Sequence, residues 1–272
     1  MDRQHLVGCD MELTMQMPTD VEELPALADR AAGWSDVVAE LTRSSAARAA
    51  AGALWQRPGA VGVLSGAAPV VWVHGATDIE ELLDTLADAP RVYETYVATD
   101  RPGIIAALQT TGWTAAELMV QLVCDDLPVV EVAPDLPAFT LLGPTDLPDM
   151  RELLRAHGGA DDDVLENAYG DDFFIAAAPV WVLGARAGDG RLVAMVAVRR
   201  QARAAMGFAL VVADDWRSRG LARAAVAAGL AQAFAVGAEF VHVQAGSDSR
   251  ELLVACGFTD VGSWQRMVRS GR

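Results

Sequence analysis

One short segment carries residue types that could bind a phosphorylated ligand. Residues 209–223 read ALVVADDWRSRGLAR, so that an apolar stretch leads to Arg217 and then to Gly220. We expect a buried strand, a short loop and a helix in that order. Such a junction gathers free backbone N–H groups and the positive end of a helix dipole at one point. Gly220 and Ala222 lack bulk, so a diphosphate can approach the backbone closely.

The charge around this junction differs from that of the whole chain. The 272 residues carry a net charge of −16, with 21 basic residues that are all arginine, and six of these arginines fall within residues 199–223. A negative chain argues against a general nucleic-acid or anionic-membrane binder, because phosphate attraction needs a basic face. The local excess of arginine instead favours one bound anion, whereas the overall charge weakly favours cationic substrates.

Several other kinds of chemistry lack their residues. Without lysine, the chain cannot form a Walker phosphate loop or a Schiff base. The three cysteines and four histidines are scattered, with no CxxC or HExxH, so we predict neither a disulfide framework nor a metal site. The N-terminus lacks the apolar core of a signal peptide, and no apolar run approaches a membrane span. We therefore expect a cytoplasmic protein that binds neither membrane nor nucleic acid.

The elements that must position the junction predict an α/β fold. After residue 138, strands alternate with helices, and Asp189-Gly190 is a strong hairpin signal. The expected strands are Phe139–Leu142, Val180–Ala187, Leu192–Val198, Met206–Ala213, Phe240–Gln244 and Trp264–Val268. The expected helices are Met150–Ala156, Val164–Tyr169, residues 220–236 and Arg250–Ala255.

The first half has a similar alternation. A helix is expected over residues 20–54, and the Asp78 side chain can cap a second one. The other expected elements are strands at Ala60–Leu64, Pro69–His74, Val92–Ala98 and Ala115–Val123, with helices at Ile79–Ala87 and Pro102–Thr110. Residues 124–138 are rich in proline and carboxylates, so we place a boundary between domains 1–130 and 131–272 there. Both halves end as strand, helix, Gly-aromatic pair and strand, which favours a tandem repeat.

At this point a family resemblance emerges. The pattern Arg217-x-x-Gly220-x-Ala222 between a strand and a helix resembles the acetyl-CoA signature of the GNAT superfamily of N-acetyltransferases. Gly257-Phe258 stands where the family has a Gly-Phe pair, and residues 139–158 resemble its opening pattern. The resemblance covers residues 137–269. It implies a GNAT fold, a mixed central sheet flanked by helices, preceded here by a reduced GNAT-like domain.

The resemblance also implies a co-substrate and a reaction. Acetyl-CoA would lie with its pantetheine arm along one strand and its pyrophosphate on the loop, with no metal involved. The residues implied are Leu210, Val211 and Val212 for the arm, and Arg217, Ser218, Arg219, Gly220, Leu221, Ala222 and Arg223 for the phosphates. The acetyl group would pass to a primary amine of a small molecule or amino acid by direct attack, with a backbone amide near Val212 holding the oxyanion.

The catalytic groups are less clear because the sequence departs from the family pattern. The tyrosine that often protonates the leaving thiolate is replaced by Leu253. His242 and Tyr169 are the candidate base and acceptor-site residue, beside the acidic positions Glu166, Asp171 and Asp172. Two alternatives therefore stay open: transfer of a longer acyl chain, and a catalytically silent CoA-binding regulatory protein. The chain could be a monomer or a homodimer.

The corresponding junction of the first half looks unsuited to a diphosphate. Residues 70–78 lead into the helix Ile79–Ala87 without an arginine, and Asp78, Glu80 and Glu81 crowd its start. Acidic groups stabilise a helix N-terminus but repel phosphate. We predict that this half binds no CoA and instead shapes the acceptor pocket.

Overall fold

The computed structural model describes residues 37, 38, 40, 54–64, 70–89, 92, 94–158, 165, 169, 170, 173, 174 and 180–269. In the first half the elements are β1 (Leu54–Arg57), β2 (Ala60–Val63), β3 (Val70–Val73), α2 (Ile79–Asp88), β4 (Glu94–Ala98), α3 (Pro102–Thr110) and β5 (Trp113–Cys124). These confirm the strands and helices expected from residue 60 onwards. Most of the helix expected over residues 20–54 lies outside the described residues; residues 37, 38 and 40 are helical, whereas Leu54 begins β1, a strand that the sequence did not predict.

The second half also follows its expected order. Its elements are β6 (Phe139–Leu142), α4 (Leu147–His157), β7 (Val180–Arg186), β8 (Leu192–Gln201), β9 (Ala204–Val212), α6 (Leu221–Ala235), β10 (Phe240–Ala245), α7 (Ser247–Ala255) and β11 (Thr259–Arg269). Short 3₁₀ turns at Pro144–Asp146 and Asp214–Trp216 precede α4 and α6. Most of the helix expected at Val164–Tyr169 lies outside the described residues.

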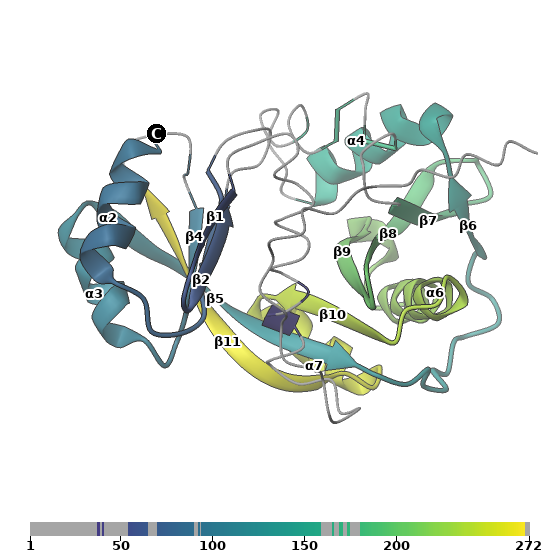
Figure 1. Ribbon diagram of the computed structural model, residues 1–272. Coiled ribbons are helices and arrows are strands. Elements are labelled where there is room, and N and C mark those ends of the chain that lie inside the picture. The colour runs from purple at the N-terminus through teal and green to yellow at the C-terminus, as the bar shows by residue number, and fades with distance from the viewer. Residues whose placement is uncertain are drawn as a thin grey trace, which may run out of the picture.

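All of the described strands form one mixed sheet of 11 strands, in the order β1-β2-β3-β4-β11-β5-β10-β9-β8-β7-β6. Helices α2 and α3 lie against the strands of the first half, whereas α4 and α6 lie on opposite faces of the sheet in the second half (Figure 1). The predicted fold class, a mixed central sheet flanked by helices, is confirmed. None of the described helices, of which α6 is the longest with 15 residues, has the length and hydropathy that a membrane span requires.

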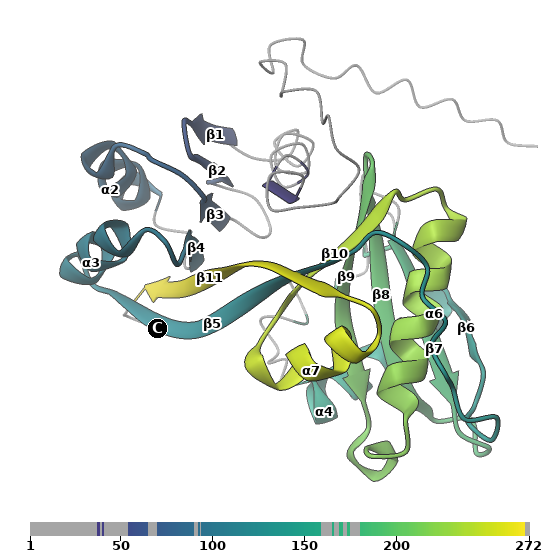
Figure 2. The ribbon, with the colours of Figure 1, turned by 90° about the horizontal axis from the view of Figure 1, so that it is seen from below.

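The two halves exchange their last strands. β5 of the first half lies between β10 and β11 of the second, and β11 lies between β4 and β5 of the first. Both exchanged strands are long and run past one another across the middle of the molecule (Figure 2). Each half therefore completes its sheet with a strand from the other. The boundary near residue 130 stays a prediction, although residues 125–138 contain no helix or strand.

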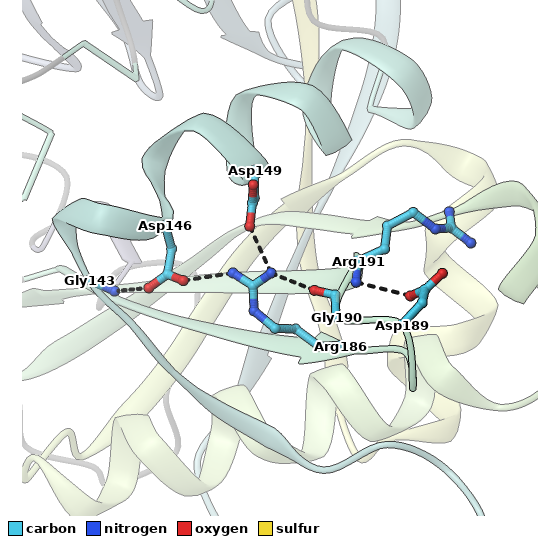
Figure 3. Close-up of polar contacts among 7 residues, drawn as sticks. All are labelled: Gly143, Asp146, Asp149, Arg186, Asp189, Gly190 and Arg191. Atoms are coloured by element: carbon cyan, nitrogen blue, oxygen red, sulfur yellow. Dashed lines mark hydrogen bonds and ion pairs between the residues drawn. The ribbon is translucent and has the colours of Figure 1, made fainter.

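A charged clamp fixes α4 on the second half. The Arg186 guanidinium on β7 donates to Asp146 Oδ1 and Asp149 Oδ2 at the start of α4, each at 2.7 Å, and to the Gly190 carbonyl at 2.8 Å (Figure 3). The Gly143 N–H donates to the other Asp146 oxygen at 2.8 Å. This backbone bond, aided by Arg186, lowers the pKa of Asp146. The clamp matters for the site because Leu154, further along α4, lines the cavity described below.

Replacing Arg186 by methionine should lower the free energy of unfolding by about 1 kcal/mol, because two carboxylates lose one shared partner that is only about a third exposed. Urea unfolding followed by circular dichroism measures the change. Arg191→Met is the matched control, since Arg191 also pairs with an aspartate, Asp215, but on a more exposed surface. Equal losses in the two variants would contradict a special role for the clamp.

Candidate active site

The main cavity of the described residues lies where two neighbouring strands separate. β9 and β10 are parallel but pair only over Ala204–Met206 and Phe240–His242, and diverge beyond. β9 also bulges here: its register with β8 shifts between Met195 and Ala197, and Ala209 has a φ of 52°. The gap holds a cavity of about 550 Å³. A splayed parallel pair thus opens the middle of the sheet to a ligand.

Both faces of the sheet contribute to the cavity. On one face α6 packs on the strands, and on the other Leu154 of α4 and Tyr169 belong to a separate hydrophobic core. The lining residues from the α6 and α7 side are apolar apart from Ser249. They include Val198, Val226, Gly229, Leu230, Val243, Leu253 and Phe258, and the lining on the opposite face includes Met119, Leu154, Tyr169, Phe208 and Gln244. The cavity therefore connects two chemically different faces.

The arginine-rich loop follows β9 at the open end of this gap. Gly220 caps α6 with a φ of 86°, and Ser218 has a φ of 60°. The first helical hydrogen bond runs from Ala224 N to Gly220 O at 3.0 Å, and the N–H groups of residues 218–223 find no backbone acceptor among the described residues. Successive free N–H groups at a helix start form an anion site. The junction predicted from sequence is thus present in the fold.

The arginines of this loop are arranged differently from one another. Arg217 pairs with Asp214 at 2.9 Å, so part of its charge is neutralised before any ligand binds. The Arg219 guanidinium lies 4.9 Å from the Trp216 ring centroid, which fixes its direction without cancelling its charge. Arg223 is exposed on the first turn of α6. Arg219 and Arg223 therefore keep more of the positive charge expected here than Arg217 does.

Two of the three residues predicted to flank the pantetheine arm line the cavity. These are Leu210 and Val211, whereas Val212 is not among the lining residues and stands opposite Ala194 in the β8 register. Leu253, at the position where the family often has tyrosine, is buried and lines the cavity. The departure noted in the sequence thus removes a hydroxyl from the cavity wall.

Tyr169 is the one predicted catalytic residue that reaches the cavity. Its side chain is buried, and burial raises the pKa of its phenol. Its backbone carbonyl accepts a hydrogen bond from Arg151 Nε at 2.8 Å, which ties the segment to α4. A phenol held neutral can donate a hydrogen bond or a proton. Glu166, Asp171 and Asp172 lie outside the described residues.

The position of His242 does not support its predicted role as a base. It is 1% exposed and does not line the cavity, whereas its neighbours Val241 and Val243 do. Its Nε2 donates to Gln201 Oε1 at 2.6 Å, and its Nδ1 lies 3.4 Å from Gln121 Nε2. Burial lowers the pKa of the ring to about 4. Both ring nitrogens are engaged by amides of Gln201 and Gln121, and the role of His242 as a base stays a prediction that these contacts do not favour.

Sequence reasoning missed two groups of cavity residues. Met119 comes from β5 of the first half and reaches the cavity only because the strands are exchanged. The Glu117 carboxylate, on the same strand, packs against Gly246 at the cavity edge. A pattern of alternating residues predicts a strand but not its partner, so neither contact had a signal. Gln244 and Phe208 lie on strands that were predicted. Their polar and aromatic side chains were the only sign in the sequence that they could contact a ligand.

The first half has no equivalent gap among its described strands. β3 and β4 are also parallel, but they pair along their whole length, from Val70↔Glu94 to Val73↔Val97. The Asp78 carboxylate accepts from Glu80 N and Glu81 N at the start of α2. The N–H groups of His74 and Gly75 donate to Gly59 O at 2.8 and 2.9 Å. Four amides of this junction, those of His74, Gly75, Glu80 and Glu81, are therefore already bonded.

We accordingly expect the full chain to bind one molecule of acetyl-CoA, not two. Calorimetric titration of the intact protein gives this stoichiometry directly, and the isolated first half is unsuitable because it would lack β11. Asp78→Arg, which removes a carboxylate from the first-half junction, should leave the stoichiometry unchanged. A second site of similar affinity would contradict the closed β3–β4 pairing as the reason for the difference.

Comparison with known proteins agrees with this geometry. Residues 147–258 match the model of the acetyltransferase (GNAT) family. A GCN5-related N-acetyltransferase from Kribbella flavida superposes with a TM-score of 0.63 at 16% identity, covering 86% of this chain and 96% of its own. One from Sphaerobacter thermophilus gives 0.56 at 15% identity, covering 78% and 77%.

A tandem arrangement also has a solved counterpart. A tandem GNAT protein from the clavulanic acid biosynthesis pathway superposes with a TM-score of 0.54 at 15% identity, covering 78% of this chain and 79% of its own. At such identities the likeness concerns the fold alone. No curated protein matches the chain in sequence. The family match therefore assigns residues 147–258 to the acetyltransferase (GNAT) family, and the solved structures share the fold of the chain.

Proposed function

We propose that the second half binds acetyl-CoA and transfers its acetyl group to a primary amine of a small molecule or amino acid. The observation that carries this proposal is the free amide row of residues 218–223 at the open end of the β9–β10 gap. A diphosphate bound there would direct the attached chain into the cavity. The cavity extends to Leu253 and Tyr169, which are among the residues that line it.

The residues of the chain suggest how each part of the reaction is supported. Leu210, Val211 and the α6 side chains would hold the apolar arm, and the bound thioester supplies the acyl group. The bulge at Ala209 and Leu210 leaves these residues without a partner in the β8 register. The bulge therefore favours a backbone N–H of Ala209 or Leu210 as the donor to the oxyanion. Val212 is less suitable because it is paired with Ala194 of β8. Tyr169, which lines the cavity, would donate a proton or a hydrogen bond.

The test is release of free thiol from acetyl-CoA in the presence of an amine panel. Turnover that depends on both substrates would support acetyl transfer. Faster release from longer acyl-CoA thioesters would favour the longer-chain alternative.

Tyr169→Phe, which removes only the hydroxyl, should lower kcat by about 10- to 100-fold and leave acetyl-CoA affinity unchanged.

A second candidate has one observation in its favour. Leu253 places an apolar side chain in the cavity where the family often has a tyrosine, so a protein that binds CoA without turnover fits the same fold. Acetyl-CoA binding without thiol release on any amine of the panel would support this regulatory role. Turnover with any amine would exclude it.

A further inference from the structure

Two buried hydrogen-bond donors beside the cavity have no acceptor in the part of the chain that the structure describes. Arg199 Nε and Gln244 Nε2 are both shielded from solvent, and neither finds a hydrogen-bond partner among the described residues. Buried polar groups of folded proteins are almost always paired, so two orphan donors at one cavity need an explanation. A ligand that brings oxygen acceptors would supply it.

The described surroundings of Arg199 contain no carboxylate paired with its charge. Its guanidinium carbon lies 5.2 Å from the ring centroid of Phe208, a cavity-lining residue. Tyr169, which also lines the cavity, is near enough that it and Arg199 each affect the other's pKa, and burial lowers the pKa of Arg199. No ion pair joins Arg199 to a carboxylate in the part of the chain that the structure describes. Among the described residues, this half-buried cation beside Phe208 therefore has no anion.

Arg199 and Gln244 lie on the same face of the sheet. Gln201, two residues after Arg199 on β8, bonds to His242, which is two residues before Gln244 on β10. Because side chains alternate along a strand, Arg199 and Gln244 share the face of that bond. Val198 lies on the other face, where it packs with Val226 and Leu230 of α6. The two orphan donors are thus on the face away from α6, beside Tyr169.

We propose that the acceptor carries a carboxylate as well as its amine, and that Arg199 and Gln244 bind this carboxylate on the face opposite α6. The inference rests on the proposed function for the identity of the reacting amine. A guanidinium and an amide are planar donors that match the planar oxygens of a carboxylate. One uncompensated arginine balances one negative charge. The acceptor class is therefore an amino acid or another amine with a carboxyl group.

Binding to the intact protein tests the proposal without turnover. The probes are acetylated amino acids and their carboxamides, which differ only in the charged group, and calorimetry measures the Kd of each. We expect the best-bound carboxylate to bind at least about tenfold more tightly than its amide. Arg199→Gln should reduce that ratio to about one, and Arg199→Lys should retain part of it, because the charge stays while the planar fork is lost.

The neighbouring arginine provides the matched control. Arg200 is half-buried on the same strand but points to the opposite face, so Arg200→Gln should keep the preference for carboxylate. The proposal would be overturned if Arg199→Gln and Arg200→Gln lost the preference for the carboxylate equally. It would also be overturned if the native protein bound no acetylated amino acid more tightly than its carboxamide. Thiol release from amines with no such preference would overturn it while leaving acetyl transfer intact. Binding of the carboxylates without any acetyl-CoA binding would instead overturn the proposed function alone.

Discussion

Aspartate at position 220 is expected to weaken acetyl-CoA binding by about a thousandfold or more, or about 4 kcal/mol. Gly220 lies in the left-handed region, with a φ of 86°, at the amide row that would hold the pyrophosphate. A side chain there meets backbone strain, and a carboxylate adds repulsion against two phosphates in a partly desolvated site. Calorimetric titration of the variant against the native protein measures the loss.

Two controls separate charge from strain. Gly220→Ala shares the strain but not the charge, and the nearest atom to its methyl would be Leu136 Cδ1 at 3.9 Å, so its loss should stay near tenfold. Gly237→Asp introduces the same carboxylate at a glycine with a φ of 80° beyond the other end of α6, in open space. That variant should bind acetyl-CoA normally. An aspartate at 220 that binds as well as the alanine variant would mean that no phosphate lies there.

The local parts of this site could be predicted because their signals are local. The buried strand, the loop with glycine and the helix of small residues follow one another directly in the sequence. The spacing of apolar residues, with a period of 2 in a strand and 3.6 in a helix, predicts each of them. The acidic start of α2 likewise led to the prediction that the first half binds no phosphate. The structure adds a reason that no short segment carries: β3 and β4 stay paired, whereas β9 and β10 separate.

The long-range parts of the fold could not be predicted in the same way. Alternation shows that His242 and Val243 face opposite sides of the sheet, but not which side chains of each face reach the cavity. The answer depends on Gln121 and Trp264, which are far from His242 in the chain. Gln121 Oε1 accepts from Trp264 Nε1 at 3.1 Å, and Gln121 Nε2 donates to Val243 O at 2.9 Å. Only the exchange of β5 and β11 brings these groups together.

That buried junction should make the protein sensitive to acid. The folded pKa of His242 is about 4, against 6.5 for an unperturbed histidine, so the unfolded chain takes up the proton first. Stability from the neutral ring is fully present above about pH 6.5 and falls as the pH drops toward 4. The loss over this window is about 3 kcal/mol. Urea unfolding at a series of pH values measures it.

His242→Gln separates this titration from the rest of the protein, because glutamine fills a similar space and keeps a polar group but does not titrate. In this variant the free energy of unfolding should fall much less between pH 6.5 and pH 4, because most of the loss of about 3 kcal/mol that comes from the histidine is removed. Some slope should remain, since burial also lowers the pKa of His74. An unchanged slope would show that the ring already takes up its proton within the folded protein.

The same variant decides between a structural and a catalytic histidine. A ring whose nitrogens bond to Gln201 and Gln121, away from the cavity wall, cannot take a proton from an amine without breaking that network. At a pH where the variant stays folded, acetyl transfer should therefore proceed within about threefold of the native rate, well short of the loss that follows removal of a base. A fall of a hundredfold with an unchanged melting temperature would return His242 to the catalytic site and require the β10 side chains to rearrange when acetyl-CoA binds.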